Sequence, residues 1–126
     1  LSPERGDMMR DHKKLRAFEL ADDLVMAVYA ATRFFPREEQ SGLTSQLRRA
    51  AISIASNIVE GCARNSEGDF LHFLDMAYGS AREAEYQISL AQRLGYLPAE
   101  EFRKIQIKCE ETAKVLSGLI RSLRKK

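Results

Sequence analysis

Apolar side chains recur at alternating steps of three and four residues along most of this chain. In the longest run the spacing holds over seven consecutive positions: Phe70, Leu74, Ala77, Ala81, Ala84, Ile88 and Ala91. Steps of three and four place side chains on one face of an α-helix, whereas a strand needs steps of two. The chain is therefore expected to fold from helices that each bury one apolar stripe.

Residues that interrupt helices divide this pattern into four segments. We expect helices over about 14–35, 42–61, 66–94 and 98–124. Pro36 ends the first segment, Gly95 ends the third, and Ser66 is placed to cap the third, with Asp69 three residues later. The connections are short, so sequence neighbours should pack antiparallel. The sequence predicts an all-α, antiparallel up-down-up-down four-helix bundle.

The remainder of the chain adds no second domain. Its 126 residues are a common size for one core. Residues 1–13 are polar, and we predict that they are disordered or an addition to the natural protein, with the bundle over 14–126. No apolar run approaches the roughly 20 residues needed to cross a bilayer. We expect a cytoplasmic protein that does not contact membranes.

The chain offers little of the chemistry that catalytic sites need. A di-metal site in a helical bundle takes a Glu-x-x-His motif on each of two helices. The nearest approach is Asp69-x-x-His72, and no second copy exists. Cys62 and Cys109 form no CxxC pair, and we expect buried thiols rather than a disulfide. Phosphate-binding glycine loops are missing. We predict a non-enzyme with no cofactor and no metal site.

One helix carries a polar stripe opposite its apolar stripe. The stripe follows helical spacing and has an extra cation beside it: Arg49, Ser53, Asn57, Glu60 and Arg64, with Arg48. In one interpretation the three arginines grip phosphates of a nucleic acid. In the other the stripe is a solvated face or a hydrogen-bond network between subunits. No aromatic residue interleaves with these cations as a base-stacking platform requires.

Basic residues gather at both ends of the chain. The net charge of +2 is only mildly basic, but eight cations lie near the termini: Arg10, Lys13, Lys14, Arg16, Arg121, Arg124, Lys125 and Lys126. Four up-and-down helices bring both termini to one end of a bundle, where these cations could attract a polyanion. Alternatively, the C-terminal group offsets the helix dipole and keeps the tail solvated.

Apolar residues also lie off the main stripes, including Phe34, Leu71 and Tyr78. Small residues such as Gly79 and Ser80 allow another helix to approach closely. A monomeric bundle needs only one buried stripe per helix. The surplus favours self-association over a monomer with a broad core.

The run from Gly42 to Gly61, GLTSQLRRAAISIASNIVEG, closely resembles the signature of bacterial four-helix bundle proteins encoded in 23S rRNA intervening sequences. Matches continue in FLHFL at 70–74, AYGSAREAE at 77–85 and LGYL at 94–97. The resemblance implies an antiparallel four-helix bundle, commonly a ring-shaped homopentamer, with no known catalytic residues. Ala55 departs from the pattern, because relatives often carry a proline there that kinks the helix.

These observations leave two functional hypotheses. The first is a homo-oligomer, pentameric by the resemblance, that serves as an adaptor and contacts RNA or an RNA-bound protein. The alternative is a purely protein-binding or structural oligomer with no affinity for nucleic acid. Steep salt dependence of RNA binding separates the two, since phosphate contacts release counterions.

Overall fold

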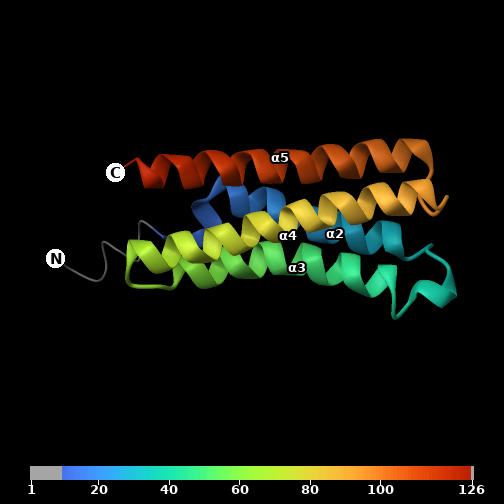
Figure 1. Ribbon diagram of the computed structural model, residues 1–126, viewed down its shortest axis with the longest axis horizontal. Coiled ribbons are helices and arrows are strands. Elements are labelled where there is room, and N and C mark those ends of the chain that lie inside the picture. The colour runs from blue at the N-terminus through green and yellow to red at the C-terminus, as the bar shows by residue number, and fades with distance from the viewer. Residues whose placement is uncertain (1–9, 126) are drawn as a thin grey trace.

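The structure, a computed structural model, describes residues 10–125 (Figure 1). Within them lie four α-helices: α2 (Arg16–Thr32), α3 (Leu43–Cys62), α4 (Glu67–Arg93) and α5 (Ala99–Arg124). Consecutive helices run antiparallel, and α5 returns to pack against α2. The predicted all-α, up-down-up-down four-helix bundle is confirmed. None of the helices in this part of the chain is long and apolar enough to span a membrane.

The helix ends follow local sequence signals with small shifts. The Ser66 hydroxyl accepts a hydrogen bond from the Asp69 backbone N–H at 3.1 Å, which caps α4. Gly95 follows α4 with a φ of 82°, a conformation that costs glycine little. The first helix ends at Thr32, three residues earlier than expected, although Phe35 is still buried. The next connection contains a short 3₁₀ turn, η2 (Arg37–Glu39), that the sequence pattern did not reveal.

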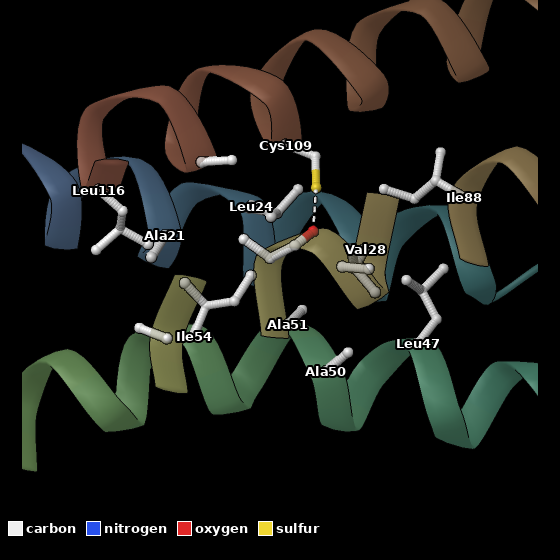
Figure 2. Packing of buried hydrophobic residues seen from close by; sticks show 14 of the residues in the cluster. Ala21, Leu24, Val28, Leu47, Ala50, Ala51, Ile54, Ile88, Cys109 and Leu116 are labelled. Atoms are coloured by element: carbon white, nitrogen blue, oxygen red, sulfur yellow. Dashed lines mark hydrogen bonds between the residues drawn. The ribbon is translucent and has the colours of Figure 1, made fainter. Parts of the chain in front are cut away.

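The core is the set of predicted stripes brought face to face (Figure 2). Its largest fully buried side chains come from all four helices: Leu24, Val28, Leu47, Ile54, Ile58, Leu74, Ile88 and Leu116. Cys109 lies among them, and its thiol donates to the Ala81 carbonyl at 3.4 Å. Cys109 and Cys62 are both buried and free of disulfides, as expected.

Contacts with the bundle begin before the first helix. Arg10 packs over the Phe70 ring at 5.2 Å, and its guanidinium donates to the carbonyls of Arg64, Asn65 and Ser66 in the α3–α4 turn. A 3₁₀ turn, η1 (His12–Lys14), then leads into α2. Residues 10–13 thus pack on the bundle, although the sequence assigned them to the segment preceding it. The rest of that segment, residues 1–9, lies outside the described residues.

Candidate nucleic-acid and subunit interfaces

Arg48 lies apart from the polar stripe of α3. Its Nε donates to the Thr32 hydroxyl oxygen at 2.8 Å, and its guanidinium lies 4.5 Å from the centre of the Tyr29 ring. Both partners belong to the α2 side of the bundle. A step of one residue turns a helix by about 100°, which is why Arg48 and Arg49 face different neighbours. Arg48 is half-buried and joins α3 to α2.

The centre of the polar stripe forms a hydrogen-bond network inside the protomer. The hydroxyl oxygens of Ser53 and Ser80 lie 2.9 Å apart across the α3–α4 seam. The Asn57 side-chain amide donates to the Ser53 carbonyl at 2.9 Å and to the Ser53 hydroxyl oxygen at 3.0 Å. All three residues are half-buried. The network therefore links two helices of one chain.

The other stripe residues are exposed. Arg49 and Glu60 form no hydrogen bond or ion pair with the residues that the structure describes. Arg64 follows the end of α3, where its guanidinium lies 4.6 Å from the centre of the Phe73 ring. Of the three arginines expected to bind phosphate, Arg64 alone lies at the end of the bundle that holds the chain termini.

That end carries the cations predicted from the two chain termini. The start of α2, the α3–α4 turn and the end of α5 lie together there (Figure 1). We define the basic pole as its eight described cations: Arg10, Lys13, Lys14, Arg16, Arg64, Arg121, Arg124 and Lys125. Seven of these were predicted from the chain termini, and the eighth predicted cation, Lys126, lies outside the described residues. The first and last described segments of the chain lie at one end of the bundle, as the up-down-up-down topology predicts.

Acidic side chains neutralise part of the basic pole. Arg16 pairs with Glu19 at 2.7 Å, and Arg124 pairs with Asp75 at 2.6 Å. Six carboxylates in all lie at this end: Asp11, Glu19, Glu60, Glu67, Asp69 and Asp75. The described pole therefore retains a positive surplus. Lys13, Lys14 and Lys125 are exposed and have no ion pair within residues 10–125, so their ammonium groups are open to solvent.

A second surface feature is an apolar groove between α2 and α5, which we call the α2–α5 groove. It has a volume of about 560 Å³. Ala27, Ala30 and Ala31 line it from α2, Lys104 and Ile105 line it from α5, and Phe34 stands at its edge with 80% of its surface exposed. The sequence indicated surplus apolar surface but gave no sign of a groove, because α2 and α5 lie at opposite ends of the chain.

The outer side of α4 carries a third feature, the α4 strip, made of Glu83, Tyr86, Leu90, Arg93 and Leu94. Tyr86 is 60% exposed and Leu94 is 50% exposed, while Leu90 is half-buried. The Arg93 guanidinium lies 5.8 Å from the Tyr86 ring centre. The strip is apolar in the middle and carries one charge of each sign.

The two cysteines and His72, for which we predict no catalytic or metal-binding role, are buried or packed against other side chains. Burial raises the pKa of the Cys109 thiol to about 12 and that of the Cys62 thiol to about 11, so both stay protonated near neutral pH. His72 is exposed and packs edge-on against Phe73, with 5.8 Å between ring centres. Across residues 10–125, no three His, Cys, Asp or Glu side chains are grouped so that they could hold a metal ion.

Comparison with known proteins gives a consistent result. The sequence model of the 23S rRNA-intervening sequence protein family matches residues 13–118. A crystal structure of a Bacteroides thetaiotaomicron protein of unknown function, from the S23 ribosomal protein family, superposes with a TM-score of 0.77. That protein is 25% identical to this chain, and the match covers 83% of this chain and 95% of the other. Curated proteins give no match.

Proposed function

Since the chain belongs to the 23S rRNA-intervening sequence protein family, we propose that it is a non-enzymatic, cytoplasmic homo-oligomer that contacts RNA, or a protein bound to RNA, through its basic pole. The observation that carries the proposal is the positive surplus at the end of the bundle where both termini lie. Polyanions are attracted to such a surface without any need for base-specific contacts.

The open ammonium groups of the pole are suited to phosphate. Lys13 and Lys14 sit on η1, and Lys125 follows the last turn of α5, so the three extend the pole from two separate elements. Lysine binds phosphate as a mobile point charge, which tolerates the irregular backbone of folded RNA. Arg64 adds a planar guanidinium beside them, on the Phe73 ring.

Self-association is the second part of the proposal. Phe34, Met26, Tyr86 and Leu94 each expose half or more of their surface. Phe34 lies at the α2–α5 groove, and Tyr86 and Leu94 lie on the α4 strip, so each adds to a larger apolar surface of the kind that marks contacts with other molecules. Five subunits is the number that the family resemblance implies. Repeating a modest pole by rotational symmetry multiplies the field that an RNA meets.

Salt-dependent binding tests the RNA contact. A labelled 23S rRNA fragment is titrated with protein between about 50 and 200 mM salt, where phosphate contacts lose affinity steeply. The variant Lys13→Glu/Lys14→Glu should bind at least tenfold more weakly with a shallower salt slope. Its control is Arg33→Glu/Arg37→Glu, an equal charge change on exposed arginines near the opposite end of the bundle. Equal losses in both variants would overturn a role for the pole.

The exposed apolar residues also fit a second candidate, a protein-binding or structural oligomer with no nucleic-acid affinity. In that case the wild-type protein binds the RNA weakly or not at all, and any residual binding is the same for all variants. The same titration therefore decides between the two candidates.

A further inference from the structure

We propose that the α2–α5 groove of one protomer receives the α4 strip of a second copy of this chain. The contact is heterologous, since two different surfaces meet. The inference rests on the self-association proposed above and adds which surfaces form the interface. Four observations support it: the placement of the two surfaces, their level along the bundle, their polarity and their charges.

The first observation is placement. The groove opens between α2 and α5, whereas the strip lies on the outside of α4, which packs between α3 and α5. A protomer cannot fill its own groove with its own strip. A two-fold axis at either surface would pair groove with groove or strip with strip and would leave the complementary surface uncovered. A head-to-tail arrangement covers both.

The second observation is level along the bundle axis. Lys108 pairs with Asp23 at 2.6 Å, and the neighbouring Cys109 bonds to Ala81, so these residues lie at one level. Between the level of Lys108 and the α4–α5 connection, the groove is lined by α2 and α5. Over the same length α4 presents the strip, which begins at Glu83. A neighbour placed side by side and parallel therefore brings its strip to the groove without sliding.

The third observation is polarity and shape. The groove presents alanine methyl groups and Ile105, and its volume of about 560 Å³ has room for large side chains. The strip offers Tyr86 and Leu90, which are one helical turn apart and point the same way. Covering Tyr86 and the exposed Phe34 would remove two aromatic rings from water, the kind of residue that anchors protein interfaces.

The fourth observation is charge. On the α5 wall Glu101 lies nearer the α4–α5 connection than Lys104 does. On the strip Arg93 lies nearer that connection than Glu83. A parallel neighbour therefore sets Arg93 against Glu101 and Glu83 against Lys104, whereas an antiparallel one opposes like charges. Glu101 and Lys104 form no ion pair with the described residues. The second copy is the occupant that this complementarity selects.

One consequence concerns the assembly as a whole. Each protomer has one groove and one strip, so a chain of such contacts closes into a ring when the rotation permits. Because neighbours are parallel, every basic pole lies on the same face of that ring.

Chemical crosslinking tests which surfaces meet. Ala30→Cys places a thiol in the groove and Tyr86→Cys places one on the strip, while the native cysteines are buried. With a short bismaleimide, a mixture of the two variants should give crosslinked dimers, and each variant alone should give none. Dimers from a single variant would show a two-fold contact and overturn the proposal. So would an oligomeric mixture that fails to crosslink.

Charge reversal at the exposed side chains of Lys104 and Glu83 gives a second test. Lys104→Glu or Glu83→Lys alone should raise the protein concentration at which half of the oligomer has dissociated by at least tenfold. The double variant should return this concentration to the wild-type value. Sedimentation measures it. Lys114→Glu, an exposed α5 lysine outside the groove, serves as control and should leave this concentration unchanged. A monomeric wild-type protein would overturn both self-association and this interface. If the crosslinks form as expected but the wild-type protein does not bind RNA, only the proposed RNA contact is overturned.

Discussion

Gly61 shows how packing determines a single residue of the second-helix signature. A Cβ at this position would lie 2.9 Å from the Phe73 Cβ and 3.2 Å from the Phe70 Cδ1. The clash is with the start of α4, so the missing side chain lets α3 and α4 approach where they are joined. Gly118 differs, because a Cβ there would meet only the end of the Arg121 side chain, at 4.0 Å.

These two helical glycines should therefore respond in opposite ways to alanine. We expect Gly61→Ala to lower the free energy of unfolding by about 1–3 kcal/mol, since Phe70 and Phe73 must shift. Gly118→Ala should raise it by about 0.5–1 kcal/mol, the helix-propensity gain at a site with room for a methyl group. Urea unfolding followed by circular dichroism measures both. A stabilising Gly61→Ala would contradict the close approach.

Burial of the Cys109 thiol should make the folded protein less stable at alkaline pH. Burial, followed by the nearby Glu85 and Glu110 charges, raises the pKa of the folded thiol from its ordinary 9.0 to about 12. The unfolded thiol thus loses its proton first. The stabilisation is complete below pH 9 and is lost progressively between pH 9 and 12. At pH 10 the free energy of unfolding should be about 1 kcal/mol lower than at pH 8 on account of this thiol. Urea unfolding of Cys109→Ala should show a flatter pH profile; parallel profiles would contradict this account.

At the scale of elements, Glu39 joins two connections at one end of the bundle. Its Oε1 accepts the Leu43 backbone N–H at 2.9 Å and so caps α3, and its Oε2 accepts the Tyr96 hydroxyl at 2.9 Å. The Leu43 N–H, then the Tyr96 hydroxyl, lower the pKa of the Glu39 carboxyl. The same contact raises the pKa of Tyr96, whose ring also packs against Phe35 at 5.5 Å.

Replacing this carboxylate should loosen both connections. We expect Glu39→Gln to lower the melting temperature at pH 7 by about 3–6 °C, because an amide caps α3 less well. A carboxylate with a lowered pKa stabilises the fold above its unfolded pKa and loses this effect as the pH falls. The difference between variant and wild type should thus shrink below about pH 4.5. Thermal unfolding at pH 7 and pH 3.5 checks this, and an undiminished difference at pH 3.5 would contradict it.

The elements themselves were predictable because each depends on local spacing and end signals, as at Ser66 and Gly95. Contacts between distant segments were not. Arg48 turns toward α2, and Glu39 meets Tyr96 57 residues away, only after the helices have packed. For the same reason the residues predicted as one polar face on α3 lie in three different environments: against α2, in the α3–α4 seam, and exposed to solvent. Its spacing fixed which residues share a helix face, but the neighbouring helices decided what that face meets.

For the whole molecule, topology matters more than composition. The net charge of +2 is small, yet the up-down-up-down path gathers both basic termini and Arg64 at one end. A parallel ring would then place one basic pole from every protomer on a single face. The field at that face grows with the number of subunits, whereas a lone protomer offers only its own small surplus.

RNA affinity should therefore depend on assembly. Lys104→Glu lies in the groove, away from the basic pole, so any direct effect on a phosphate contact at the pole is small. We expect this variant to bind the labelled rRNA fragment more weakly and with a shallower salt slope, because fewer poles engage one RNA. The double variant Lys104→Glu/Glu83→Lys should recover both quantities, since it restores the complementary charges and leaves the net charge at +2.

The comparison is made by fluorescence anisotropy, with sedimentation at the same protein concentrations. Weaker binding by Lys104→Glu with an unchanged oligomer would mean that the lysine itself contacts RNA, because assembly would then be the same in both proteins. Equal affinity of a dissociated variant and the wild type would mean that one pole suffices. The double variant should recover both the oligomer mass and the salt slope of RNA binding. The two recover together only if the groove forms the subunit contact and the assembled ring forms the RNA-binding face.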